Sequence, residues 1–120
     1  LFYGYMSILG CQSEPFSQGK RLYEVKCSNC HLSSGLGLGK EIPSLHKDVA
    51  QAAYWSCLIR HGKSKVIHQD GVSYARQMPS NPDLNAAEIA NLINYIQSKW
   101  VKKSEFVGLD SVNVWLNKCQ

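Results

Sequence analysis

Two cysteines and a histidine form a tight cluster of reactive side chains near the start of the chain. The segment Cys27-Ser28-Asn29-Cys30-His31 places two thiols about one helical turn apart, with an imidazole directly after the second thiol. Thiols at this spacing can add to the two vinyl groups on one edge of a porphyrin. The imidazole is then carried under the iron. The segment therefore predicts one c-type haem, attached through Cys27 and Cys30, with His31 as an axial ligand.

Two other chemistries use the same residue types and remain open as haem-free alternatives. A thioredoxin-like dithiol centre requires a βαβ setting, which the sequence pattern does not show. A zinc site requires four ligands at matched spacing, and the candidate residues form no second C-x-x-C or H-x-x-x-H pair. These candidates are Cys57, His46, His61 and His68. The three histidines are read as structural or exposed.

Met78 is a candidate for the second axial position. It precedes Pro79 in a loop, and the other methionine, Met6, lies in the apolar N-terminal stretch. A thioether favours ferrous iron, so ligation by His31 and Met78 would raise the reduction potential. The alternative is that Met78 only fills the core.

Other residues are candidates for the walls of the same site. The carbonyl of Pro43 could accept the proton of the second imidazole nitrogen of His31, which would fix the tautomer. Aromatic side chains are expected to line or edge the pocket, and one of them could bond a propionate. They are Tyr54, Trp55, Tyr74 and Trp100.

Short helices and long loops are expected to position these residues. Residues 16–31 carry apolar or small side chains at steps of three and four, which indicates one helical face. A middle helix is expected from the cap residue Asp48 to about Arg60, closed by Gly62. Residues 63–82 contain Gly71, Pro79 and Pro82, and are expected to be mostly loop.

The clearest helix follows a capping box formed by Asn85 and Glu88. A last short helix is expected after Asp110. No segment alternates with period two, so no sheet is expected, and the predicted fold class is all-α with several short helices and long loops. Two apolar faces support these helices: Ile89, Leu92, Ile93, Ile96 and Trp100 on the capped helix, and Val112, Trp115, Leu116 and Cys119 on the last.

Length and charge narrow the classes of function. The chain has 120 residues, enough for one ordinary domain, and a net charge of +4. Its basic residues are scattered and form no run longer than Lys102-Lys103, which disfavours a nucleic-acid surface. There is no apolar stretch of 18 residues that could span a membrane.

The first 15 residues are expected to be a signal-peptide remnant and tether. Residues 1–10 are largely apolar, and Ile8-Leu9-Gly10-Cys11 resembles a bacterial lipobox, in which the cysteine is lipidated after cleavage. The alternative is a disordered tail with an ordinary cysteine. The expected organisation is therefore a tether over 1–15, a domain over 16–100 and a helical extension over 101–120.

The ordered set of motifs over residues 16–99 resembles the class I monohaem cytochromes c, in particular bacterial forms that are exported or lipid-anchored. The resemblance implies a bundle of three to five helices around the haem, axial ligation by His31 and Met78, and one-electron transfer at an exposed haem edge. Gly19 would let the first helix cross the capped helix closely. The matching residues are Gly19, Tyr23, Cys27, Cys30, His31, Gly35, Gly37, Ile42, Pro43, Leu45, Gly62, Tyr74, Met78, Pro79, Glu88, Ile89, Leu92, Tyr95 and Ile96.

Three cysteines are not used by the haem. An extracytoplasmic location is expected because c-type haem is attached after export, and free thiols there tend to pair. If Cys11 is lipidated, Cys57 and Cys119 are the natural partners, and their bond would contribute about 4 kcal/mol through chain entropy. The alternatives are a Cys11–Cys119 bond, or a buried Cys57 and a free Cys119.

The predicted function is one-electron transfer by a monomeric carrier without catalytic residues. Expected partners are a quinol-oxidising complex, a terminal oxidase or a dehydrogenase, in the periplasm or at the outer face of the membrane, with Cys11 as a lipid tether. Two alternatives keep the haem: a site open to peroxide or gas, as in an enzyme or sensor, and a fixed subunit of a larger redox complex.

Overall fold

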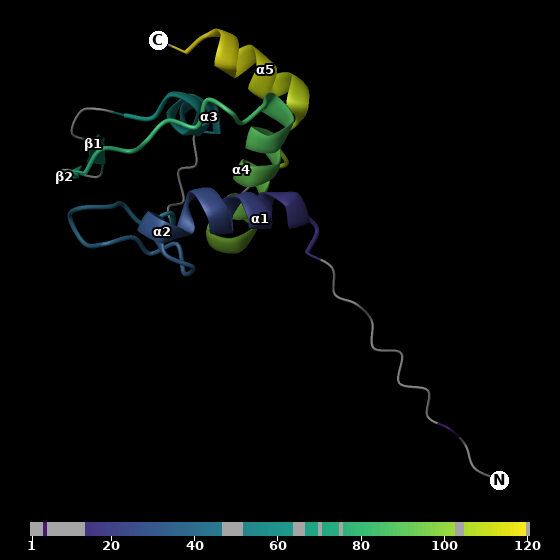
Figure 1. Cartoon of the computed structure of the whole chain (residues 1–120), viewed down its shortest axis with the longest axis horizontal. Helices are drawn as coiled ribbons and strands as arrows, with labels where there is room; N and C mark the ends of the chain where they lie inside the picture. Colours follow the sequence, from purple (N-terminus) through teal and green to yellow (C-terminus); the bar gives the residue numbers. More distant parts are fainter. Residues whose placement is uncertain are drawn as a thin grey trace.

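The computed structural model describes residues 4, 14–46, 52–63, 67–69, 71–74, 76–102 and 105–119, with backbone only at 67–69. The predictions that fall on Cys11 and on the helix cap at Asp48 lie outside these residues. The described part is mainly helical, which confirms the predicted fold class (Figure 1). Its elements are α1 (Ser17–Lys26), α2 (Ser28–His31), α3 (Ala52–His61), β1 (Ile67–Gln69), β2 (Val72–Tyr74), α4 (Ala86–Trp100) and α5 (Leu109–Asn117).

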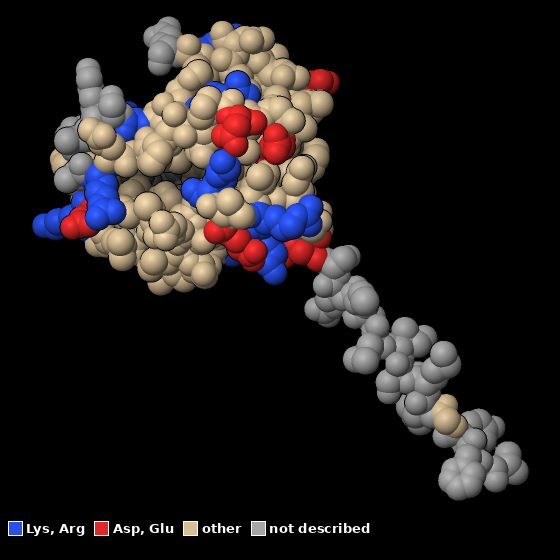
Figure 2. Space-filling model, viewed as in Figure 1, with Lys and Arg blue, Asp and Glu red and all other residues tan. Residues whose placement is uncertain are grey.

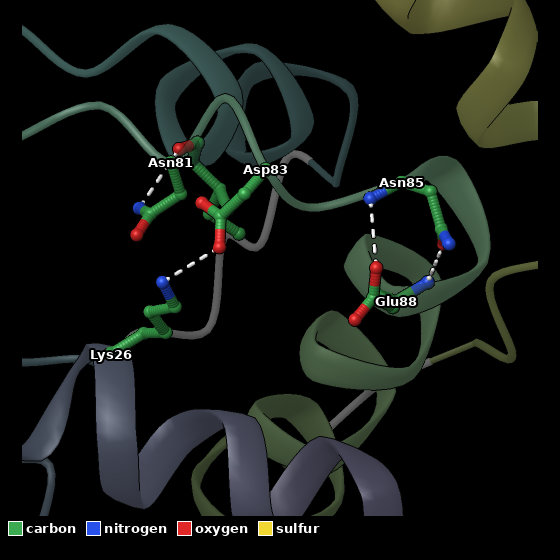
Figure 3. Close-up of polar contacts among 6 residues, drawn as sticks. Lys26, Asn81, Asp83, Asn85 and Glu88 are labelled. Carbon is green, nitrogen blue, oxygen red and sulfur yellow. Dashed lines mark hydrogen bonds and ion pairs between the residues drawn. The ribbon is translucent and has the colours of Figure 1, made fainter.

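Helix α4 is the centre of the fold and packs against α1, α3 and α5. The predicted capping box opens it: Glu88 N–H donates to the Asn85 side chain at 2.8 Å, and Asn85 N–H donates to the Glu88 carboxylate at 3.0 Å (Figure 3). Ile89, Leu92 and Ile93 are completely buried, because three helices cover them. The strongest amphipathic pattern in the sequence therefore forms the core.

Helix α1 crosses α4 at Gly19. A Cβ atom at Gly19 would overlap the carbonyl group of Asn91, so only glycine permits this approach, as predicted. Beyond the crossing, the Tyr23 ring lies 5.7 Å from that of Tyr95 and 5.1 Å from that of Trp100. The contact fixes the end of α1, and with it the reactive segment that follows.

The C-terminal segment folds back onto α3 and α4 (Figure 1). Val112 on α5 is completely buried, and Trp115 and Leu116 pack against the core. A disulfide joins Cys57 in α3 to Cys119, which confirms the predicted pairing. The apolar face of the last helix thus packs within its own domain.

The segment expected to be loop contains a small antiparallel hairpin. Ile67 pairs with Tyr74 and Gln69 with Val72, around a turn where Gly71 has a φ of +73°. This corrects the expectation of no sheet. Strands of three residues are too short to show alternation in the sequence. The first predicted helix is also divided, because α1 ends at Lys26 and α2 begins at Ser28.

Candidate functional site

The predicted reactive residues surround one cavity of about 400 Å³. Its walls come from α2, the segment 41–45, α3 and the segment 76–81. The volume is typical of cofactor sites. The predicted residues that line it are Cys27, Cys30, His31, Pro43 and Met78. Tyr74 is buried but does not line it.

The two thiols lie on a single turn of backbone. Cys30 N–H and His31 N–H both donate to the carbonyl of Cys27, at 3.2 and 2.9 Å. Cys27 is buried and Cys30 half-buried, and neither is disulfide-bonded. Burial raises the pKa of Cys27 to about 12, and the nearby Cys30 adds to the shift. The two cysteines therefore lie on one turn of backbone and both line the cavity.

The imidazole of His31 is held by a backbone carbonyl, as predicted. Nδ1 lies 3.0 Å from the oxygen of Pro43. Burial lowers the pKa of His31, and the hydrogen bond to Pro43 opposes this shift. The neutral ring donates its Nδ1 proton to Pro43 because that oxygen can only accept. Nε2 then carries the lone pair that a metal requires.

Gly37 shapes the loop behind this hydrogen bond. Its N–H donates to the His31 carbonyl at 3.0 Å. Its φ is +69°, and a Cβ atom there would lie 2.6 Å from the Pro43 oxygen. Only a residue without a side chain fits between the two backbones, so Gly37 sets the position of the carbonyl that holds His31.

Met78 lies in the segment that forms another part of the cavity wall. Its backbone forms an isolated antiparallel bridge with Lys63, just after α3, through hydrogen bonds of 2.8 and 3.0 Å. Further along, Asn81 N–H donates to the carbonyls of Ile59 and Arg60, both at 3.1 Å. The end of α3 therefore positions Met78.

Apolar side chains complete the cavity wall, and charged residues lie at its rim. Lys26 donates to the Asp83 carboxylate at 2.9 Å (Figure 3), and Arg76 pairs with Glu41 at 3.5 Å. Lys and Arg lie among Asp and Glu on the face shown in Figure 2. Sequence reasoning did not identify these ion pairs, because their partners are far apart in the chain. The apolar wall includes Leu45, Trp55, Leu58, Ile59 and Ile96.

The remaining candidates take different places. Tyr54 and Trp55 line the cavity. Trp100 instead stacks on His46 at 5.5 Å, and His46 Nε2 lies 2.6 Å from the Ser34 carbonyl, so this histidine is structural. His61 is exposed. The side chain of His68 lies outside the described residues.

The donor set fits a covalently bound haem. Two unpaired thiols on one turn, an imidazole with Nδ1 already bonded, and a thioether all line an apolar cavity. Each donor is of the type that a c-type haem uses. Among the residues that the structure describes, no three His, Cys, Asp or Glu side chains are grouped to hold a metal ion.

A small helical fold around such a cavity defines the class of c-type cytochromes, and the comparisons agree. Residues 14–96 match the family described as cytochrome c oxidase, cbb3-type, subunit III. The chain therefore belongs to the cytochrome c family, as a class I monohaem member. Membership implies covalent haem c and haem-based electron transfer. No helix in the described part is long and apolar enough to cross a membrane.

Two curated relatives are similar over most of the chain. Both are cytochrome c-552 from Thermus thermophilus. One is 27% identical over 100 residues, which cover 78% of this chain and 67% of the relative. The other is 28% identical over 91 residues, which cover 70% and 69%. Members of the family are typically electron carriers that act with redox partners.

Proposed function

We propose that the protein carries single electrons on one haem c, bound through Cys27 and Cys30 and ligated by His31 and Met78. The observation that carries the proposal is that these four residues line one cavity, although Met78 is distant in sequence from the other three. When bound, the haem supplies an iron that changes oxidation state by one electron without breaking a bond.

The chain contributes ligand orientation and exclusion of water. The Pro43 carbonyl keeps the Nδ1 proton of His31 in place, which makes Nε2 a better electron donor and favours ferric iron. The Met78 thioether favours ferrous iron. Apolar side chains such as Leu45, Leu58 and Ile96 keep the cavity dry. The balance between these contributions sets the reduction potential. Tyr74 is omitted from the proposed site because it does not line the cavity.

The rim of the cavity is suited to brief contact with another redox protein. Val25 is 75% exposed and Tyr54 43% exposed, and both line the cavity. The charged pairs Lys26–Asp83 and Arg76–Glu41 lie near them. A mixed apolar and charged rim can orient a partner without holding it tightly. A terminal oxidase is the favoured partner because the matching family takes its description from one. A quinol-oxidising complex or a dehydrogenase would be the electron donor.

The proposed setting is extracytoplasmic, as is typical of the family. A monomer tethered to the membrane through a lipid on Cys11 would stay near its partners. Fixed membership of an oxidase complex is the second candidate, and the description of the matching family favours it. Co-purification with an oxidase after detergent extraction, at a constant ratio, would support the fixed subunit over the diffusing carrier.

Optical spectra of protein made in a host that matures c-type haem test the proposal. We expect low-spin ferrous bands and the weak far-red ferric band of a sulfur–iron bond. Met78→Ala should abolish the far-red band, whereas Leu58→Ala, in the same cavity wall, should retain it. A high-spin spectrum in the unaltered protein that shifts with carbon monoxide would instead indicate an open-site enzyme or sensor. A colourless protein would overturn the haem assignment.

A further inference from the structure

The segment that carries Met78 is fastened to the C-terminal end of α3. Lys63 and Met78 exchange backbone hydrogen bonds of 2.8 and 3.0 Å. Gly62 closes α3 with a φ of +67°, and a Cβ atom there would lie 2.5 Å from the Met78 oxygen. The two backbones are therefore in direct contact, and displacement of this end of α3 displaces Met78.

Side-chain packing does not fill the space between this end of α3 and the end of α5. An open hollow of about 600 Å³ lies there, and its walls include His61, Gly62, Lys63, Trp115 and Lys118. Cys57 and Cys119 lie in the same wall, and their disulfide crosses between the two elements. A covalent bond therefore bridges a place where van der Waals contact is incomplete.

Helix α5 is itself firmly held by α4. Val112 is completely buried, and the side chain of Asn94 exchanges two hydrogen bonds of 2.8 Å with the backbone of Val107, just before α5. A continuous set of contacts thus leads from α4 through α5 and the disulfide to α3, and from there to Met78. Each link is a hydrogen-bonded, buried or covalent contact.

From this arrangement we infer that the Cys57–Cys119 disulfide positions Met78 as an axial ligand, by holding the end of α3 against the C-terminal extension. The inference rests on the proposed ligation by His31 and Met78. Without the disulfide, the end of α3 loses its covalent link to the C-terminal extension, so the Lys63–Met78 hydrogen bonds open more often and Met78 can move away from the iron. The two cysteines are positioning residues and do not touch the haem.

The inference is tested by measuring how tightly imidazole binds to the ferric protein. Imidazole would compete with Met78 for the sixth ligand position of the iron. The double variant Cys57→Ser/Cys119→Ser should bind imidazole about 2- to 30-fold more tightly than the unaltered protein, the range expected for mutations that modulate coupling between sites. Leu22→Ala is the matched control, because Leu22 on α1 packs against the core but lies outside the set of contacts that leads through α5 to α3. In the control, imidazole affinity should stay within about twofold of that of the unaltered protein. Deviations from additivity between distant, independent sites are of about this size.

A readout independent of the haem is hydrogen exchange at the amides of Lys63 and Met78. Both should exchange faster in the double variant than in Leu22→Ala at equal global stability, adjusted with denaturant. Gly62→Ala offers a second route if the double variant does not fold. It disturbs the contact with Met78 while keeping the disulfide, and should also raise imidazole affinity.

The outcomes separate the inference from the proposed function. If the unaltered protein lacks the far-red sulfur–iron band, the proposed ligation is wrong. If the band is present, and imidazole affinity and amide exchange change equally in the double variant and in Leu22→Ala, the disulfide contributes only general stability and the inference is overturned. If the double variant cannot be obtained, unchanged imidazole affinity in Gly62→Ala would overturn it.

Discussion

The side-chain amide of Asn94 forms two hydrogen bonds with one residue, Val107. Its Nδ2 donates to the Val107 carbonyl at 2.8 Å, and its Oδ1 accepts from the Val107 N–H at 2.8 Å. Both residues are buried. Val107 lies in the connection between α4 and α5, outside any helix or strand. The Asn94 side chain therefore forms the hydrogen bonds that secondary structure would otherwise provide to the Val107 backbone.

Removal of the Asn94 amide should therefore be costly. Asn94→Ala leaves two buried backbone groups of Val107 without partners, and we expect a loss of about 2–4 kcal/mol in the free energy of unfolding. Asn91→Ala, on the same helix, removes only an exposed bond to Gln18 and should cost about 0.5 kcal/mol. Denaturant titration measures both values. Equal losses in the two variants would show that the buried bonds of Asn94 to Val107 stabilise the fold no more than the exposed bond of Asn91.

The crossing of α1 and α4 should not tolerate a methyl group. Gly19→Ala forces a Cβ atom into the Asn91 carbonyl, and we expect a loss of about 3 kcal/mol or failure to fold. Lys20→Ala, at the next and exposed position, should stay within about 0.5 kcal/mol of the unaltered protein. Thermal unfolding followed by circular dichroism distinguishes them, and a stable Gly19→Ala protein would contradict the predicted clash.

Two glycines of one loop provide a matched test of the hydrogen bond to His31. Both have positive φ, but a Cβ atom at Gly37 would meet Pro43, whereas one at Gly39 would meet nothing within 4 Å. Gly37→Ala should displace the Pro43 carbonyl, weaken the bond and make the imidazole a poorer donor. We therefore expect a higher reduction potential in Gly37→Ala than in Gly39→Ala. Redox titration measures the reduction potentials of both variants. Equal potentials in the two variants, or a lower potential in Gly37→Ala, would count against the role of Pro43.

The ion pair at the cavity rim should make a contribution to stability that depends on pH. A hydrogen bond from Lys26 to the Asp83 carboxylate, together with one from the backbone N–H of Asp83 itself, holds the pKa of Asp83 below its ordinary value of 3.8. A carboxylate with a lowered pKa in the folded state stabilises the fold above its ordinary pKa. This contribution disappears as the pH falls through the lower, folded value.

Asp83→Asn tests this relationship. The variant should be slightly less stable than the unaltered protein at pH 7, and the difference should vanish at pH values below the folded pKa. High salt should also reduce the difference at pH 7, because both side chains are partly exposed. Urea titrations across the acid range measure it. A difference that persists unchanged into strong acid would rule out the ionic origin.

Local sequence signals predicted much of the fold. The capping box at Asn85 and Glu88 placed the start of α4 correctly, because both of its hydrogen bonds lie within one turn. Gly19 was identified as a crossing point because a residue without a side chain lets two helices cross closely. The Cys57–Cys119 bond followed from counting the thiols that the haem does not use.

Relationships that depend on distant segments could not be read from the sequence. The Lys63–Met78 bridge joins residues whose own types carry no pairing signal, since both contribute only backbone atoms. In the sequence, Asn94 looks like an ordinary polar residue within a helix, and Val107 looks like any other valine. Nothing in either residue type indicates that the two are hydrogen-bonded. Tyr74 was expected at the haem because aromatic residues often border such pockets, but it lies in β2 outside the cavity wall.

The placement of the four described cysteines has a consequence for how the protein is made. Cys57 and Cys119 are oxidised to each other, whereas the proposed haem attachment requires Cys27 and Cys30 to stay reduced until each has added to a vinyl group. Exchange between thiols and disulfides proceeds through the thiolate, and the buried Cys27, with a pKa of about 12, is almost entirely protonated at neutral pH. Compaction around Cys27 would therefore guard against mispairing during biogenesis.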